Sequence, residues 1–384
     1  MFVSVYAIAK NEESIAERWY DCFKEADEVC VLVNNSTDGT ADILRKLGAK
    51  VTERNYPHFR FDEARNDAMK LCSPNADLLF SSDFDDIIEK GWRKKVEHAW
   101  ELGLKTGKNP NAILFTYSVW YGDEVPKQKF LRHSIHTPNG WYWKCRIHEY
   151  LEHKSGKCFI YYPKFEMESR PVRHEHGRYL PMLEDECRDP NCEARSKHLL
   201  GREYLYHKKY EDAIEWLNKH LSSIDATWKS ERAASMKFLS DCYGGLGFEN
   251  ARELWLWKAM NENPKDRDAP FSLGMLLIRK KEYRTAATIL ERCLAIEKPE
   301  LDYPYFSLDA WTEKPLVCLA EAKFYIGEWN EALGLLDKAL KMNPACKVAL
   351  TMKDEILSHI KAGRSPAKPP EEVPRIRLEI PELS

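Results

Sequence analysis

The sequence predicts an α/β domain built on a Rossmann-like mixed sheet, followed by an all-α domain of helical repeats. In roughly the first 180 residues, short apolar runs typical of buried strands alternate with stretches of helical periodicity. From about residue 190 the strand-like runs stop, and a helical pattern recurs at a period of about 34 residues. The chain of 384 residues is also longer than a single hydrophobic core usually serves.

The first domain is expected to open with alternating strands and helices. The expected strands cover residues 2–8, 29–33, 50–54 and 77–81, and the expected helices cover residues 13–26, 41–47 and 61–72. Apolar strands separated by crossover helices are what a parallel sheet requires. After the second strand, Asp38 and Gly39 have the chemistry of a turn, and Thr40 is expected to cap the next helix. Three loops should therefore converge on one edge of the sheet.

Three carboxylates, Asp83, Asp85 and Asp86, directly follow the fourth strand. In open α/β sheets, ligands bind beyond the carboxyl ends of the strands. Mg²⁺ and Mn²⁺ prefer oxygen ligands and usually take one or two carboxylates, which leaves positions for phosphate oxygens. Asp83 and Asp85 share one face if the segment is extended, and Asp86 can replace either one if it bends. We expect a divalent cation carrying a diphosphate here; the alternative is an acidic loop that caps a helix beginning near Glu89.

Four segments resemble, in the same order, the signatures of glycosyltransferase family 2, which has the GT-A fold. They are Ala-Lys-Asn-Glu-Glu at 9–13, Ser-Thr-Asp-Gly-Thr at 36–40, Phe-Asp-Glu-Ala-Arg-Asn at 61–66 and Asp-Phe-Asp-Asp at 83–86. The resemblance covers roughly residues 2–180. It implies transfer of a sugar from a nucleotide-diphosphate donor, with inversion, and with Mn²⁺ or Mg²⁺ as cofactor.

The resemblance also implies roles for individual residues. Ala9, Lys10 and Glu12 would line the nucleotide pocket, and Arg65 would contact the base or the diphosphate. Asp83 would contact the ribose or the metal, and Asp85 would be the principal metal ligand and a catalytic residue.

One position departs from the family pattern. The family usually has an acidic residue after the second strand to hold uracil or ribose, and this chain has Asn34 and Asn35 there. An amide group both donates and accepts hydrogen bonds, so a base can still be recognised. A UDP-linked donor remains the expectation.

Residues 140–151, with Arg132 upstream, resemble a later segment of the TPR-bearing branch of the same family. A neutral imidazole suits Mn²⁺ better than Mg²⁺, so His148 can complete a metal site with Asp85. Glu149 is the candidate general base, because an inverting transfer needs a carboxylate near the acceptor proton. The metal would stabilise charge on the leaving diphosphate. The alternatives are phosphate binding by His148 and a different base, namely Asp62, Asp86 or Asp123.

Aromatic residues near this segment allow two interpretations. Trp141 and Trp143, with Trp120 and Tyr121, are candidates for a face on which a sugar stacks. Aromatic residues at alternating positions are more often the core side of an amphipathic strand, which we favour for this group.

A histidine at the rim of the active site is also expected, and the sequence does not distinguish His174 from His176. With Cys158, Cys187 and Cys192 nearby, a structural zinc site is the less favoured interpretation, because these spacings match no compact zinc signature.

The domains are expected at residues 1–185 (GT-A), 190–362 (tetratricopeptide-like, TPR, repeats) and 363–384 (an extended proline-rich tail). Four repeats and a capping helix at 347–360 are expected, with the repeat at 233–260 the least regular. Small residues recur near the repeat period, at Ala213, Ala251, Ala286 and Ala332. Stacked repeats bury their faces jointly and leave a concave surface. We expect this surface to dock the acceptor or to pair two copies in a homodimer, and the aromatic insertion at 300–314 to pack on the repeats or on a partner.

Composition restricts the partners. The net charge of −3 gives no signature of nucleic-acid binding. Eleven cysteines without a signal peptide indicate reduced thiols and a cytoplasmic location. No apolar stretch approaches the ~20 residues needed to span a membrane. The acceptor is expected to be a peptide or protein, with a saccharide or a lipid-linked precursor as the other options.

The sequence therefore predicts a metal-dependent glycosyltransferase followed by a TPR module. Two alternatives stay open: a TPR scaffold with an inactive transferase domain, which Asn34 and Asn35 favour, and a nucleotidyltransferase. The chain shows no glycine- and lysine-rich loop suited to a triphosphate, which counts against the second.

Overall fold

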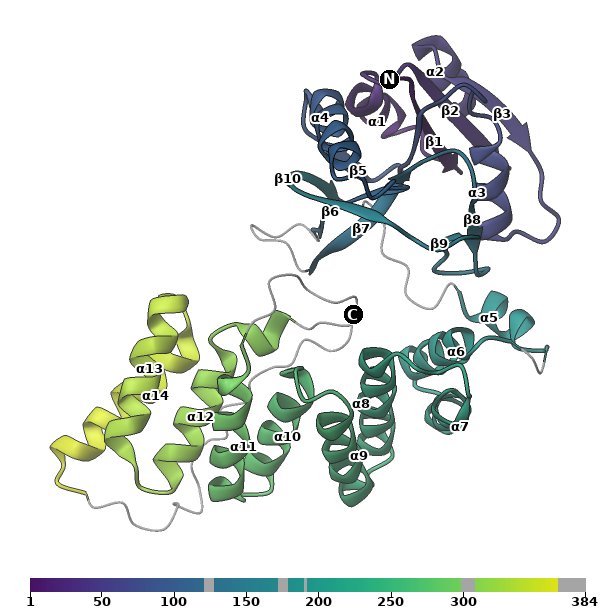
Figure 1. Cartoon of the computed structure of the whole chain (residues 1–384). Coiled ribbons are helices and arrows are strands. Elements are labelled where there is room, and N and C mark those ends of the chain that lie inside the picture. Colours follow the sequence, from purple (N-terminus) through teal and green to yellow (C-terminus); the bar gives the residue numbers. More distant parts are fainter. Residues whose placement is uncertain (121–127, 172–178, 190–191, 298–307, 365–384) are drawn as a thin grey trace. The chain divides into compact units, whose positions relative to one another are not determined.

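The computed structural model describes residues 1–120, 128–171, 179–189, 192–297 and 308–364 (Figure 1). These residues form two compact units, the first ending at residue 171 and the second beginning at residue 179.

The first unit is built on an eight-stranded mixed sheet with the strand order β3-β2-β1-β4-β7-β6-β10-β5 (Figure 1). Strands β1 to β4 run parallel, β7 runs antiparallel to both β4 and β6, and β5 pairs antiparallel with β10. A separate hairpin is formed by β8 and β9. The strands are β1 (Val3–Ala9), β2 (Glu28–Asn34), β3 (Lys50–Arg54), β4 (Leu78–Ser81), β5 (Asp86–Ile88), β6 (Ala112–Val119), β7 (Gln128–His136), β8 (Trp141–Lys144), β9 (Tyr150–His153) and β10 (Phe159–Ser169).

Helices cover both faces of this sheet. Successive residues of β1 point to opposite faces, so they pack against different helices. Val3, Val5 and Ala7 pack with helices α1 (Ala16–Phe23), α2 (Thr40–Leu47) and α4 (Trp92–Lys105) in one buried cluster. Tyr6 belongs to a second cluster, which contains residues from α3 (Phe61–Met69) and from the β8–β9 hairpin. The sheet is therefore the middle layer of the unit, and its C-terminal strand ends are left at one edge.

The predicted alternation of strands and helices is confirmed, with two local corrections. Gly39, and not Thr40, is the N-cap of α2, since Thr40 already begins the helix and its N–H donates to Asp38. The segment after β4 is not extended: the chain turns at Asp83 to Asp86, where the Asp86 N–H donates to the Asp83 carbonyl at 3.1 Å. This turn leads into the short strand β5 and not into a helix near Glu89, because α4 begins only at Trp92.

The second unit consists of antiparallel helix pairs that stack in sequence (Figure 1). The pairs are α6 with α7, α8 with α9, α10 with α11 and α12 with α13, and α14 closes the series. The helices are α5 (Leu180–Glu186), α6 (Ala194–Tyr206), α7 (Tyr210–Ser222), α8 (Lys229–Gly245), α9 (Glu249–Glu262), α10 (Asp268–Arg279), α11 (Tyr283–Ala295), α12 (Lys314–Tyr325), α13 (Trp329–Met342) and α14 (Lys347–Lys361).

Small residues set the spacing within the pairs. A Cβ at Gly201 would approach Leu217 to 2.7 Å, and one at Gly274 would approach Leu290 to 2.5 Å, so only glycine fits at these two equivalent positions. Ala213, Ala286 and Ala332 are fully buried as predicted. Ala251 is only partly buried, and Leu256, Ala259 and Met260 make the core contacts of α9 instead.

The described end of the aromatic insertion packs on the repeats. Leu308–Trp311 forms a 3-10 helix that contacts α10 and α12, and Trp311 is buried with the Arg267 guanidinium 4.0 Å from its ring centroid. Residues 300–307 of the insertion and the tail from residue 365 on lie outside the described residues.

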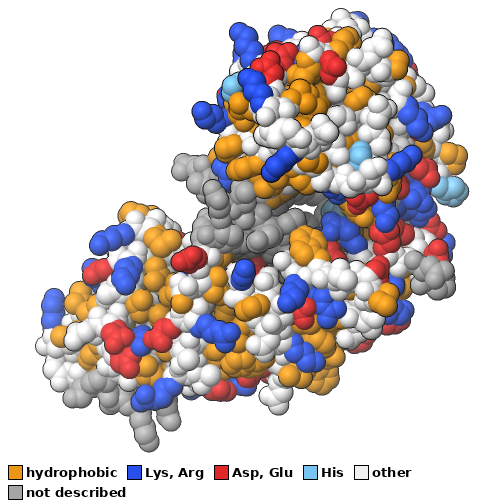
Figure 2. Space-filling model, in the orientation of Figure 1, with side chains coloured by type: hydrophobic (Ala, Val, Ile, Leu, Met, Phe, Trp, Pro, Cys, Tyr) orange, Lys and Arg blue, Asp and Glu red, His pale blue; other side chains and the backbone are white. Residues whose placement is uncertain are grey.

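Three further properties concern the chain as a whole. All eleven cysteines are free thiols. Among the described helices, none combines the length and apolar character that crossing a bilayer demands. On the face seen in Figure 2, lysine and arginine side chains are interspersed with aspartate and glutamate side chains over both units.

Candidate active site

The candidate site lies where β4, β6 and β10 of the first unit end. β4 ends at Ser81, and the turn that follows carries Asp83, Asp85 and Asp86. One carboxylate oxygen from each of the three lies within 4.8 Å of the other two. Among the described residues, this is the only candidate cation site that consists entirely of carboxylates. The three aspartates therefore lie just beyond the end of the fourth strand, as expected.

Asp86 is a fully buried carboxylate that fixes the turn. One of its oxygens accepts from the Tyr117 hydroxyl at 2.7 Å, and the other accepts from the Asp83 backbone N–H at 2.7 Å. Burial raises the pKa of Asp86 to about 7; Arg132 opposes this shift, and the Asp83 and Asp85 charges add to it. Asp86 thus supports the turn through hydrogen bonds to both of its carboxylate oxygens.

Two arginines hold Asp83, the buried Arg65 and the partly buried Arg132. Arg65 donates from Nη2 to one carboxylate oxygen, and Arg132 donates from Nη2 to the other at 3.1 Å. Although burial opposes ionisation, Arg65 and Arg132 keep the pKa of Asp83 well below its ordinary value. The Arg132 guanidinium also lies 4.5 Å from the ring centroid of Tyr117, so it is fixed from a second side.

Arg65 also pairs with the candidate base. Its Nε donates to Oε1 of Glu149, its Nη1 donates to Ser81 at 3.3 Å, and its guanidinium lies 4.8 Å from the ring centroid of Trp143. The side chain of Arg65 is 7% exposed and that of Glu149 is 10% exposed. A single buried guanidinium thus links Glu149 to Asp83.

Asp85 differs from its neighbours because it has no ion pair with any residue that the structure describes. Its Oδ2 accepts from the Ser169 hydroxyl at 2.8 Å, and burial together with the Asp83 charge raises its pKa. The site holds four carboxyl groups, those of Asp83, Asp85, Asp86 and Glu149. Within the described part of the chain, their only ion pairs are with the guanidinium groups of Arg65 and Arg132, and Asp85 makes none. Up to two negative charges are therefore not compensated when all four are ionised. A divalent cation would supply that compensation, and carboxylate oxygens are the donors that Mg²⁺ and Mn²⁺ prefer, so the residues present fit such a metal.

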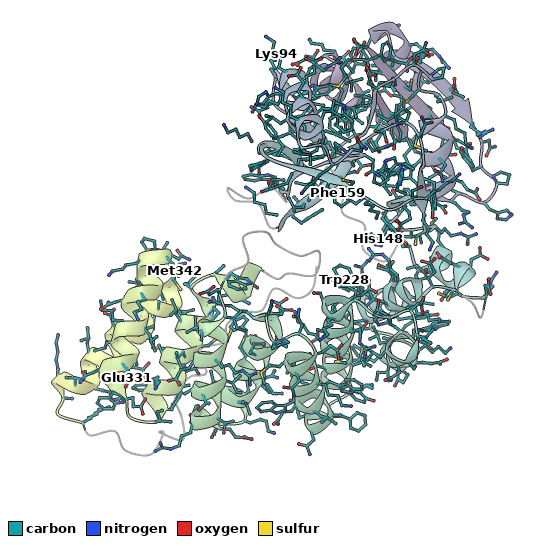
Figure 3. The ribbon with its side chains drawn as sticks, viewed as in Figure 1. Lys94, His148, Phe159, Trp228, Glu331 and Met342 are labelled. Carbon is teal, nitrogen blue, oxygen red and sulfur yellow. The ribbon has the colours of Figure 1, made fainter. Side chains whose placement is uncertain are left out.

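His148 lies in the loop between β8 and β9 (Figure 3), with an exposed side chain and a left-handed backbone (φ 53°). It is not part of the carboxylate group described above. The structure thus brings Glu149 to Arg65 but does not bring His148 to Asp85.

Five of the predicted nucleotide-binding residues, namely Ala9, Lys10, Glu12, Asn34 and Asn35, lie at the ends of β1 and β2 and in the loops that follow. The loop after β1 is tied to the loop after β2, because the Glu12 N–H donates to Thr40 Oγ1 at 2.8 Å. Ala9 is buried at the end of β1, and Lys10 is exposed.

The two asparagines after β2 differ in environment. Asn34 is 3% exposed, and its Oδ1 is buried without a hydrogen-bond partner in the described part of the chain. Asn35 is exposed and has a left-handed backbone (φ 49°). Of the two, Asn34 therefore offers an unpaired, fixed acceptor for a ligand at this edge.

The remaining candidates separate clearly. Trp141 and Trp143 are buried in the core, as favoured from their alternation. Asp62 is paired with Arg60 at 2.8 Å and is not in the carboxylate group. Tyr121, Asp123, His174 and His176 lie outside the described residues.

Sequence reasoning missed three supporting side chains. Tyr117 and Ser169 hold Asp86 and Asp85, and Arg132 was noted without a role. All three lie on strands β6, β7 and β10, which come after the region where strand and helix alternate regularly. Only Arg132 gave a signal, because it precedes the segment at 140–151 that resembles the family.

Clustered carboxylates and paired arginines at the C-terminal edge of a mixed α/β sheet are an arrangement that fits an anionic ligand with a divalent cation. Residues 4–165 match the family described as Glycosyl transferase family 2. Over 97 residues the chain is 32% identical to a protein of Rickettsia bellii (strain RML369-C) named "Uncharacterized glycosyltransferase". That match covers 25% of this chain and 32% of the relative, so the chain spans about a third of the relative's length. Residues 4–165 of the first unit thus match glycosyl transferase family 2, in agreement with the predicted family, and the predicted fold class is confirmed.

Solved structures similar to the chain include TPR proteins. A thermophilic TPR protein from Thermus thermophilus is 21% identical, with 47% of this chain and 92% of that chain covered and a TM-score of 0.33. YrrB, a TPR protein described as having an unusual peptide-binding site, is 19% identical, with 46% of this chain and 88% of that chain covered and a TM-score of 0.35. The repeat fold of the second unit is shown by its own series of helix pairs, together with the glycines at the close contacts within two of them.

Proposed function

We propose that this protein is a metal-dependent glycosyltransferase that moves a sugar, with inversion, from a UDP-linked donor to an acceptor docked on the TPR unit. The observation that carries the proposal is the carboxylate turn after β4, in which Asp85 has no ion pair with a described residue while negative charge is left uncompensated. A nucleoside diphosphate with its divalent cation fits such a turn. The family match of residues 4–165 supports the same chemistry.

In this proposal Asp85 is the principal ligand of Mn²⁺ or Mg²⁺, and Asp83 contacts the metal or the ribose. When bound, the metal supplies Lewis-acid stabilisation of charge on the leaving diphosphate. Ser169 orients Asp85, and Asp86 orients the Asp83 backbone, so the turn is preorganised before the ligand arrives. His148 contributes from its exposed loop, as a further metal ligand or as a phosphate contact.

Glu149 is the proposed general base. Its ion pair with Arg65 engages Oε1, which leaves Oε2 as the oxygen that accepts the acceptor proton. Arg65 holds Glu149 at a fixed place relative to Asp83. Ala9, Lys10, Glu12 and Asn34, with Asn35 beside them, form the proposed nucleotide pocket, in which the unpaired Oδ1 of Asn34 accepts from the base.

A polypeptide is the proposed acceptor, because stacked repeats present an extended surface that suits an extended chain. Saccharides and lipid-linked precursors are the other outcomes of an acceptor screen. A homodimer through the TPR unit and a cytoplasmic location complete the proposal; the free state of all eleven cysteines supports the location.

The test is release of nucleoside diphosphate by purified protein from UDP-, GDP- and TDP-sugars, with Mn²⁺, Mg²⁺ or EDTA. Asp85→Asn is the test variant, and Asp42→Asn, an exposed aspartate of α2, is the matched control. Metal-dependent release that is lost in Asp85→Asn and kept in Asp42→Asn supports the proposal. No turnover and no metal-dependent donor binding would favour the inactive scaffold, and release of pyrophosphate from a nucleoside triphosphate would favour a nucleotidyltransferase.

A further inference from the structure

Trp120 and Arg170 form a stacked pair beside the candidate metal site. Parallel strands β6 and β10 end side by side, with Val119 opposite Ser169. Trp120 and Arg170, the residues that directly follow these two, are therefore neighbours. The Arg170 guanidinium carbon lies 4.7 Å from the ring centroid of Trp120, a distance at which a planar cation attracts an aromatic face.

This pair is anchored to the segment that holds Asp85. The backbone N–H of Trp120 donates to the Ser169 carbonyl at 2.9 Å, and the backbone N–H of Arg170 donates to the Asp85 carbonyl at 2.9 Å. The Ser169 hydroxyl donates to the Asp85 carboxylate at 2.8 Å. Glu168 pairs with the Arg170 guanidinium at 2.8 Å, which fixes the guanidinium beside the ring. The indole thus has a fixed position next to the proposed metal ligand.

The indole is also incompletely satisfied. Its ring is partly exposed, and its Nε1–H is buried without an acceptor among the described residues. A buried donor without a partner is costly and rare in native proteins. A ligand that places an acceptor oxygen near Nε1 and an apolar face on the ring would remove this cost.

The pair lies on the opposite side of the carboxylates from the proposed base pocket. In the sheet order, β6 is four strands from β2, which carries Asn34, and β4 with the carboxylate turn lies between them. At about 4.8 Å per strand, this separation is roughly 19 Å. If the base binds at β2 and the diphosphate at the turn, the group beyond the diphosphate reaches the end of β6.

We propose that Trp120, supported by Arg170, is the wall on which the pyranose ring of the donor stacks, with the indole N–H donating to a sugar hydroxyl. This inference rests on the proposed function and deepens it, because it assigns the sugar subsite. A pyranose has the required apolar C–H face and acceptor oxygens, whereas a free nucleoside diphosphate ends before the indole. Arg170 acts as a positioning residue behind the ring.

The test compares two ligands that differ only in the sugar. Isothermal titration calorimetry with Mn²⁺ measures the affinity for UDP, GDP and TDP, each free and as its glucose derivative. Trp120→Ala should weaken binding of the glucose derivative by about fivefold to tenfold, the size of one aromatic stacking contact. It should leave the affinity for the free diphosphate within about twofold of wild type, which also shows that the variant is folded.

Two more variants separate the parts of the contact. Trp120→Phe keeps a ring and removes the N–H, so it should recover part of the lost affinity. Trp216→Ala is the matched control, because Trp216 is a partly buried tryptophan of the second unit that also lies beside a cation, Lys219, at 3.9 Å. It should bind both ligands as wild type does.

Three outcomes contradict the sugar subsite or the proposed function in distinguishable ways. Equal losses for the free and sugar-linked diphosphate, or no loss for either, would overturn the sugar subsite. An unchanged donor affinity with a raised KM for the acceptor would also overturn it, because the ring would then serve the acceptor. Wild-type protein that binds none of these nucleotides would contradict the proposed function itself, before any variant is compared.

Discussion

Arg65 and Glu149 form a buried ion pair across 84 positions of sequence, and the same guanidinium holds Asp83. Arg65 therefore positions both the proposed general base, which acts on the acceptor, and a carboxylate of the metal turn, which acts on the donor. This arrangement makes the two carboxylates a single structural unit, so a change at Arg65 should affect both.

Arg65→Lys is expected to lose most of the activity and part of the stability. An ammonium group cannot reproduce the fork that reaches Glu149, Asp83 and Ser81 together, so at least one buried carboxylate loses its partner. Breaking a buried pair costs about 3–5 kcal/mol. Urea unfolding should show this loss, while Arg54→Lys, which alters an exposed pair with Asp67, should lie within about 1 kcal/mol of wild type. An Arg65→Lys protein with wild-type stability and turnover would contradict the shared role.

Glu149→Gln should separate catalysis from binding. The amide keeps the size of the side chain but cannot accept a proton, so transfer should fall by about 10²- to 10⁴-fold. Donor affinity, measured by calorimetry with Mn²⁺, should change by less than about fivefold, which corresponds to about 1 kcal/mol. Glu152→Gln, on the neighbouring strand and paired with Lys157, is the control. Retained turnover in Glu149→Gln would move the role of base to another carboxylate.

Asp86 predicts a pH dependence of stability in the absence of metal. Its pKa is raised from 3.8 to about 7, so between these values the folded state binds the proton more tightly than the unfolded state does. Stability from this group is therefore fully present below pH 3.8 and is lost as pH rises toward about 7. The slope is at most about 1.4 kcal/mol per pH unit. Unfolding in EDTA, followed from about pH 5 to about pH 8, should show a weaker decline in Asp86→Asn than in wild type. An identical decline in both would show that Asp86 is ionised throughout.

His148→Ala is expected to affect the metal less than Asp85→Asn does. His148 is exposed and lies outside the carboxylate group, whereas Asp85 is within it and has no competing ion pair with a described residue. Titration with Mn²⁺ should show a loss of less than about tenfold for His148→Ala, since one exposed ligand contributes less than about 1.4 kcal/mol. A complete loss would mean that the β8–β9 loop closes on the metal when it binds.

The regular first part of the chain could be predicted well from its sequence. Strand β3 at Lys50–Arg54 has the expected bounds. Strands β1 and β2 differ from expectation by one residue at each end, and β4 differs by one residue at its start. These segments are local patterns of apolar residues bounded by turns, so their signal lies within a few residues.

The supporting network of the site could not be predicted in the same way. Tyr117 reaches Asp86 over 31 positions, and Ser169 reaches Asp85 over 84, through pairings of β6 and β10 that no local pattern specifies. The resemblance alone named Arg65, whereas Asp83 followed from its place after a strand and Glu149 from the need for a base. Their ion pairs appear only when α3, β4 and the β8–β9 hairpin are packed together. The sequence did not show how distant strands pair, and this pairing decides which side chains meet in the site.

The central claim is that the turn after β4 holds a divalent cation for a nucleoside diphosphate. Its most direct test is electron paramagnetic resonance of free Mn²⁺ during titration with the protein, with and without UDP. The account predicts Mn²⁺ binding that UDP tightens, that Asp85→Asn abolishes, and that Asp42→Asn leaves unchanged. Free Mn²⁺ that stays constant with and without UDP, or binding that survives in Asp85→Asn, would contradict it.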